Sequence, residues 1–124
     1  MAEVVAVRAK DAVGKYGEEV AARHLTDAGL EIVDRNWRCS DGEIDIIARD
    51  GDVLVICEVK TRSSVLFGLP AEAITGRKRD RMRRLAYRWL KENPLRPVEV
   101  RFDVVSVIRN DRGAATVEHL RAAF

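Results

Sequence analysis

The stretch that most constrains the fold is GEIDIIARDGDVLVICEVKTRSS, residues 42–64. Two apolar segments, Glu43–Arg49 and Val53–Lys60, flank an Asp-Gly dipeptide at Asp50, a sequence typical of the turn between two paired strands. The sequence therefore predicts a β-hairpin. The run Val53–Cys57 contains no polar residue, so we expect its strand to be buried on both faces.

Helices and further strands are predicted on either side of this hairpin. A helix over Asp11–Ala28 has one apolar face and ends at Gly29. A second helix over Gly76–Glu92 follows an N-cap at Thr75, and Pro94 ends it. The remaining predictions are a loose leader over 1–10, strands over Leu30–Trp37, Val98–Ile108 and Thr116–Leu120, a loop over 61–70 and a helical turn over Pro70–Ile74.

The order of these elements, αβββαββ, predicts an α/β fold with a mixed sheet flanked by helices. We expect a single domain over residues 1–124, because 124 residues with 47% hydrophobic content suffice for one core. The start of the chain lacks the apolar core of a signal peptide, and no apolar run is long enough to span a membrane. The two cysteines have no ligand-like spacing, which favours reduced thiols and a cytoplasmic protein.

Three charged residues lie where an apolar strand should be buried. Glu58 and Lys60 share one face at the end of the second hairpin strand, and Asp45 lies near Glu58 across the hairpin, within a residue or two of register. Carboxylate oxygens are ligands that Mg²⁺ and Mn²⁺ prefer, and a nearby lysine can orient water or neutralise charge on a phosphate. The alternative is a cross-strand salt bridge on a solvated face.

The spacing Asp45…Glu58-Val59-Lys60 resembles the PD-(D/E)XK nuclease motif, with Ile44 in place of the proline. The chain as a whole resembles the YraN-like family of small bacterial proteins, which has a fold like that of Holliday-junction resolvases. The matching segments cover nearly the whole chain in order: Gly14…Gly17-Glu18, Arg35-Asn36-Trp37-Arg38, Gly42–Ile47, Glu58–Arg62, Phe67-Gly68, Lys78, Arg101–Val104 and Ala123-Phe124.

This resemblance implies a restriction-endonuclease-like αβββαβ core and a nuclease that uses Mg²⁺ or Mn²⁺. Asp45, Glu58 and the carbonyl of Val59 would be metal ligands, and Lys60 would orient water or stabilise charge. Resolvases make two symmetric cuts, so the resemblance also implies a homodimer acting on branched or otherwise structured DNA.

Two more carboxylates are candidates for the same site. Glu18 would be an auxiliary ligand or water acceptor, and it borders the apolar face of its helix, whereas Glu19 points toward solvent. A surface charge is the simpler alternative for Glu18. Glu43 shares a strand face with Asp45 but lies ~7 Å farther along, so it would support the ligands without touching the metal.

The second helix carries eight Lys or Arg residues against one Asp between Arg77 and Lys91. Four arginines and Lys91 recur at helical spacing opposite the apolar face, over ~21 Å, and we predict that this stripe binds nucleic acid: Arg77, Arg81, Arg84 and Arg88. A solvated face is the alternative, and the stripe could also bind DNA away from the site or a partner protein. Lys78 is also predicted to bind nucleic acid. It lies on the buried margin of the helix, where it either reaches toward the cleft or snorkels to solvent.

Two functions remain open at this stage, a metal-dependent DNA nuclease and a non-catalytic DNA-binding or adaptor module on a nuclease fold. The net charge of only +2 decides nothing between them. The sequence also leaves open DNA versus RNA and endonuclease versus exonuclease action.

Overall fold

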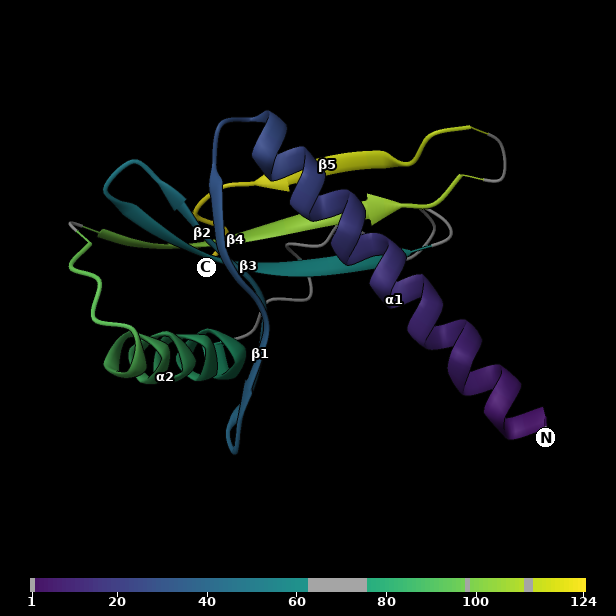
Figure 1. Ribbon diagram of the computed structural model, residues 1–124, viewed down its shortest axis with the longest axis horizontal. Coiled ribbons are helices and arrows are strands. Elements are labelled where there is room, and N and C mark those ends of the chain that lie inside the picture. Colours follow the sequence, from purple (N-terminus) through teal and green to yellow (C-terminus); the bar gives the residue numbers. More distant parts are fainter. Residues whose placement is uncertain (1, 63–75, 98, 111–112) are drawn as a thin grey trace.

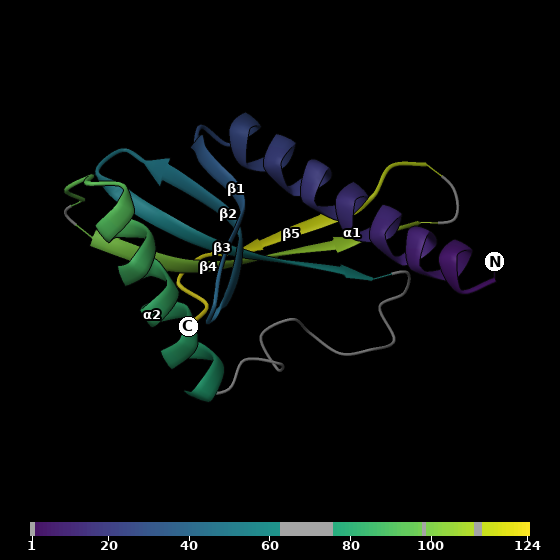
Figure 2. The ribbon, with the colours of Figure 1, turned by 60° about the horizontal axis from the view of Figure 1, so that its bottom comes forward.

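The computed structural model of the chain describes residues 2–62, 76–97, 99–110 and 113–124. Five strands form one sheet in the order β1-β2-β3-β4-β5, and a helix covers each face (Figure 1; Figure 2). Neighbouring strands are antiparallel except β3 and β4, which pair in parallel. The elements are α1 (Ala2–Asp27), β1 (Glu31–Cys39), β2 (Gly42–Asp50), β3 (Val53–Arg62), α2 (Gly76–Glu92), β4 (Glu99–Ile108) and β5 (Thr116–Leu120). This is the predicted mixed α/β architecture, consistent with a restriction-endonuclease-like fold.

Two elements have the predicted bounds, β1 to β4 begin or end within two residues of prediction, and the start of α1 and the hairpin turn need correction. Thr61 and Arg62, which we predicted to be loop, belong to β3. α2 and β5 have the predicted bounds, and α1 ends in a Schellman motif in which Gly29 has φ 96° and Leu30 N–H donates to the carbonyl of Leu25. α1 begins at Ala2 rather than at Asp11, because the segment before Asp11 contains no Gly or Pro to interrupt a helix.

The hairpin turn lies one residue later than predicted. Asp50 pairs with Val53, so the two turn residues are Gly51 and Asp52, and Gly51 adopts the positive φ of 62° that this tight turn requires. Thr75, the helical turn over Pro70–Ile74, most of the 61–70 loop and Val98 lie outside the described residues.

The side chains of the sheet divide into two cores by face. On one face, Ala21, Ala22 and Leu25 of α1 pack on strand residues that include Cys57. On the other, Met82, Leu85, Ala86 and Trp89 of α2 pack on a second set: Ile44, Ile47, Leu54 and Ile56. The central strands are thus buried on both faces, as the apolar run predicted. No helix in the described part of the chain is long and apolar enough to cross a membrane.

Candidate active site

β2 and β3 separate at the position of Asp45. Their regular pairing runs from Asp50–Val53 to Ile46–Cys57. Just beyond it, the backbone N–H of Val59 donates a 2.8 Å hydrogen bond to Asp45 Oδ2. The carboxylate therefore takes the place of a strand carbonyl, and it lies in the opening between the two strands.

An irregularity in β1 accompanies this opening. Asn36 lies opposite Asp45, between two regular pairs, and has φ 54° although it is not a glycine. Ile44 packs on the α2 face and Ile46 on the α1 face, whereas residues two apart in a regular strand share one face. The β1–β2 ribbon is therefore twisted at Asn36 and Asp45, and this twist turns the Asp45 side chain toward β3.

Glu58 holds the second carboxylate, and its two oxygens have different surroundings. Lys60 Nζ lies 3.5 Å from Oε1, and Lys78 Nζ of α2 forms an ion pair with the same oxygen. Oε2 is buried and has no hydrogen-bond partner among the residues that the structure describes. Burial, together with the adjacent Lys78, lowers the pKa of Lys60. Two ammonium groups and a partly unsatisfied carboxylate thus meet beside Asp45.

Two cavities reach this point from opposite faces of the sheet, and Asp45 and Val59 line both. The α2-side cavity, about 410 Å³, is also lined by Glu58, Lys78 and Arg81. The α1-side cavity, about 390 Å³, is lined instead by residues that include Glu18 and Thr61. Among the described residues, basic side chains therefore line the α2-side cavity alone, beside its carboxylates, whereas the charged side chains that line the α1-side cavity are the carboxylates of Glu18 and Asp45.

Asp45 is the most electrostatically unusual group at the site. Its pKa is raised from 3.8 to about 6: burial raises it most, the negative charges of Glu18, Glu58 and Glu43 add to this, and the Val59 hydrogen bond acts against them. A carboxylate held among other carboxylates in this way is a common arrangement in functional sites.

The structure separates Glu18 from its neighbour as the helical periodicity predicted. Glu18 lines the α1-side cavity, whereas Glu19 is exposed and pairs with Arg35 at 3.1 Å. The close approach of α1 to β3 brings Glu18 there, because Gly17 packs directly against Thr61. Glu43 lies at the rim of the α2-side cavity and pairs with Arg38 at 3.0 Å.

The basic stripe on α2 is not uniform. Arg77, Arg81 and Arg84 are exposed, and Arg81 lines the α2-side cavity, so the stripe is continuous with the site rather than separate from it. Arg88 instead pairs with Asp41 at 3.0 Å and donates to Ser40 in the β1–β2 turn. One of the four predicted arginines thus helps to hold that turn on α2.

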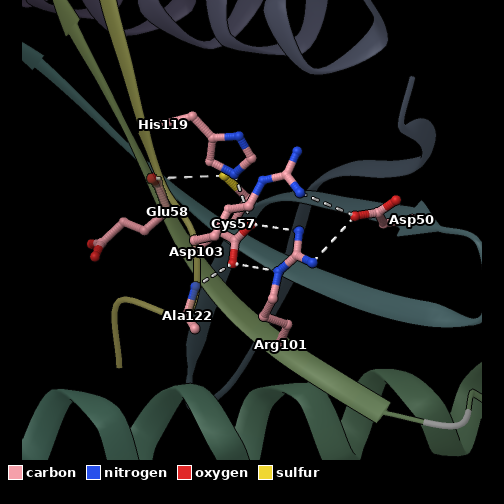
Figure 3. Close-up of polar contacts among 8 residues, drawn as sticks. Asp50, Cys57, Glu58, Arg101, Asp103, His119 and Ala122 are labelled. Atoms are coloured by element: carbon pink, nitrogen blue, oxygen red, sulfur yellow. Dashed lines mark hydrogen bonds and ion pairs between the residues drawn. The ribbon is translucent and has the colours of Figure 1, made fainter. Parts of the chain in front are cut away.

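A second polar cluster lies on the α1 face of β4, and we did not predict it. Asp103 is fully buried and accepts hydrogen bonds from Arg101, from the Ala122 N–H and, at 2.7 Å, from His119 Nε2 (Figure 3). The Glu58 side chain points away from this cluster (Figure 3). A single Asp in the apolar strand RFDVVSV was the sequence signal for it. These satisfied contacts indicate a structural role.

The donor set at Asp45 and Glu58 suits a small divalent cation. No group of three or more His, Cys, Asp or Glu side chains gathers in a metal-binding arrangement within the described residues. Mg²⁺ does not require such a cage, because it is usually held by one or two carboxylates and keeps several waters. The unsatisfied, buried Glu58 Oε2 beside a second carboxylate and the Val59 backbone fits that requirement.

Comparison with known proteins assigns the chain to a family. Residues 17–107 match the uncharacterised protein family UPF0102. The chain belongs to the UPF0102 family. A UPF0102 protein of Frankia alni is 61% identical over 120 residues, which cover 97% of this chain and 100% of that protein. UPF0102 proteins of Beutenbergia cavernae, 62% identical over 93% of this chain and 98% of theirs, and Nocardia farcinica, 53% identical over 93% and 91%, are also similar.

The part of the chain that matches UPF0102 contains all the site residues predicted from the sequence. Glu18 lies at its beginning, the hairpin carboxylates at its centre and the arginines of α2 in its second half. The strained Asn36 and the buried Asp103, which we did not predict, also lie within it. The UPF0102 match therefore spans both the candidate site and the contacts that shape it.

Proposed function

We propose that this UPF0102 protein is a divalent-cation-dependent nuclease that hydrolyses phosphodiester bonds in DNA. The observation that carries the proposal is the meeting of Asp45, Glu58 and Lys60 where β2 and β3 separate, with Glu58 Oε2 buried and not satisfied by any described residue. Burying an unsatisfied carboxylate oxygen is costly for stability alone, so a ligand that would satisfy it supplies a reason for the arrangement.

Asp45, Glu58 and the Val59 carbonyl would hold Mg²⁺ or Mn²⁺. When bound, the cation would activate water and shield the charge that develops on the phosphate. Lys60 would orient the water or neutralise that charge, and Glu18 would accept a hydrogen bond from water on the α1 side. Hydrolysis adds water to phosphorus and breaks one bond to a sugar oxygen, which leaves as an alcohol.

The substrate would approach along the α2-side cavity. Lys78 and Arg81 line it, and Arg77 and Arg84 continue the positive charge along α2. A phosphodiester backbone suits this surface because phosphate contacts by Lys and Arg dominate the affinity for nucleic acids. Branched or otherwise structured DNA is the substrate that the resolvase-like fold favours, and DNA is preferred to RNA for the same reason.

A panel of labelled substrates with Mn²⁺ or Mg²⁺ tests the proposal. It should include branched, flapped, duplex and single-stranded DNA as well as RNA. Asp45→Ala and Glu58→Ala should abolish cleavage while circular dichroism shows an intact fold. Glu19→Gln is the matched control for Glu18→Gln, and only the latter should slow cleavage. Cleavage that survives both alanine substitutions would identify a contaminant. Light scattering reports whether the active species is the homodimer that the resemblance implies.

The second candidate is a DNA-binding or adaptor module without catalysis. The ion pair between Lys78 and Glu58 favours it, because an ammonium group already neutralises one of the two proposed ligands. Calorimetric titration separates the two functions. Salt-sensitive DNA binding without any binding of millimolar Mn²⁺ would support the adaptor and exclude the nuclease.

A further inference from the structure

Two lysines approach one oxygen of Glu58 and leave the other unpaired. Lys60 and Lys78 both contact Oε1, while Oε2 is buried without a partner in the described part of the chain. The side chains of Glu58 and Lys78 are 16% and 17% exposed, so solvent screens this pair only weakly. The local charge on Glu58 is therefore already offset before any cation binds.

The two lysines differ in how they reach Glu58. Lys60 is fixed two residues away on the same face of β3, whereas Lys78 comes from the first turn of α2. Lys78 also lines the α2-side cavity, where Arg81 carries a second positive charge. A lysine side chain is a point charge on a flexible stem of four carbons. Lys78 can thus turn from Glu58 into the cavity without any movement of the sheet.

We infer that Lys78 exchanges partners between Glu58 and the phosphodiester. It neutralises Glu58 while no divalent cation is present, and it moves to the backbone of the nucleic acid when one binds. The inference rests on the proposed function and deepens it. A cation at Asp45 and Glu58 repels the ammonium group that now contacts Glu58, and a phosphate in the α2-side cavity attracts it.

This exchange makes the binding of the cation and of DNA mutually favourable. DNA that draws Lys78 away from Glu58 increases the affinity for the cation, and by linkage the cation increases the affinity for DNA by the same factor. We expect this coupling from Lys78 and not from Arg79, which lies in the same turn of α2 but is exposed and does not line the cavity. Arg79 therefore provides a matched control.

The first measurement is calorimetric titration of Mn²⁺ into the wild-type protein, Lys78→Gln and Arg79→Gln without DNA. Lys78→Gln should bind Mn²⁺ about 5- to 100-fold more tightly than the wild type, in the range of typical coupling factors, and Arg79→Gln should not differ. Equal or weaker binding by Lys78→Gln would overturn the partner exchange. If no variant binds Mn²⁺, the proposed nuclease fails as well, so the two failures are distinguishable.

The second measurement is the affinity for a DNA duplex with and without Ca²⁺, which replaces Mn²⁺ to limit cleavage. Ca²⁺ should tighten DNA binding by the wild type and by Arg79→Gln, and it should tighten binding less in Lys78→Gln, where only the direct attraction between the cation and the phosphate remains. An undiminished Ca²⁺ effect in Lys78→Gln would contradict the inference. Lys78→Met keeps the apolar stem and serves in both experiments if Lys78→Gln does not fold.

Discussion

Gly17 of α1 packs against Thr61 of β3 with no room for a side chain at residue 17. A β-carbon there would overlap Thr61 Oγ1 and lie 2.8 Å from Thr61 Cβ. This contact brings the next residue, Glu18, to the α1-side cavity beside Asp45. The absence of a side chain at Gly17 thus determines how closely α1, and with it Glu18, approaches β3.

Replacing Gly17 by alanine should destabilise the protein and displace Glu18. We expect a loss of about 1–3 kcal/mol in the free energy of unfolding, as for other overpacked sites. Gly14→Ala is the control, because a β-carbon there meets nothing within 4 Å and alanine favours a helix by about 0.5–1 kcal/mol. Urea denaturation measures both, and a Gly17→Ala protein as stable as the wild type would show that α1 adjusts freely.

Asn36 should tolerate glycine and resist β-branched residues. Its φ of 54° is in the left-handed region, where residues other than glycine are strained by about 1–2 kcal/mol and asparagine is among the better tolerated. Asn36→Gly should therefore retain nearly full stability, whereas Asn36→Val should lose at least about 1 kcal/mol and reduce cleavage by misdirecting Asp45. Equal stability of the two variants in urea would exclude this account.

Asp45 should destabilise the protein at neutral pH when no cation is bound. Because burial and the neighbouring carboxylates raise its pKa from 3.8 to about 6, the native state holds this proton more tightly, and stability falls as the pH rises between these values. Asp45→Asn keeps an oxygen for the Val59 N–H, and it should raise the unfolding free energy by roughly 1–3 kcal/mol near neutral pH. The gain should vanish near about pH 4. Thermal unfolding in EDTA at several pH values tests both expectations.

Asp103 should show the opposite pH dependence. Burial by itself would raise its pKa, but hydrogen bonds from Arg101, the Ala122 N–H and His119 outweigh it and hold the pKa below the usual 3.8. The stability that this carboxylate contributes is present above about pH 4 and is lost as the pH falls further. Asp103→Asn should cost about 3–5 kcal/mol at neutral pH, because it leaves the cluster without its negative charge.

Urea denaturation of Asp103→Asn across this acidic range measures the effect. The difference from the wild type should shrink as the pH falls. Asp50→Asn is a suitable control, since the side chain of Asp50 is 35% exposed and contacts Arg101 only from the edge of the cluster. A difference from the wild type that stays constant with pH would show that the charge of Asp103 does not matter.

The exposed arginines of α2 should govern the salt dependence of DNA binding. Each of Arg77→Gln, Arg81→Gln and Arg84→Gln should reduce the slope of log affinity against log salt by about 0.9 for duplex DNA if that arginine contacts a phosphate. Arg109→Gln, an exposed arginine at the end of β4, should leave the slope unchanged. If the slope is unchanged in the three α2 variants as well as in Arg109→Gln, the DNA-binding surface does not lie on α2.

The sequence predicts those features whose cause is local. The bounds of α2 follow from its amphipathic pattern and from Pro94, and the proximity of Asp45 to Glu58 follows, within one residue of register, from a short turn at Gly51 between two apolar strands. The strained backbone of Asn36 is not predictable in this way, because asparagine adopts the left-handed region in only some contexts.

Contacts between elements that lie far apart in the sequence are also not predictable from the sequence pattern. The periodicity placed Lys78 on the buried margin of α2 but left its target open, because the position of the helix over the sheet depends on packing with four strand residues. Similarly, a single aspartate in β4 does not reveal that Arg101 and His119 will satisfy it. The separation of β2 from β3, which the site requires, arises only in the assembled sheet.

The parallel pairing of β3 with β4 has a consequence for synthesis of the protein on the ribosome. β1, β2 and β3 follow one another along the chain and can pair quickly. β4, the parallel partner of β3, begins only at Glu99, so α2 and the segments on either side of it must be synthesised before β3 and β4 can pair. Until then the strand that contains the apolar run Val53–Cys57 has an open edge, the kind of surface that promotes aggregation of nascent chains. Emergence of β4 from the ribosome closes that edge.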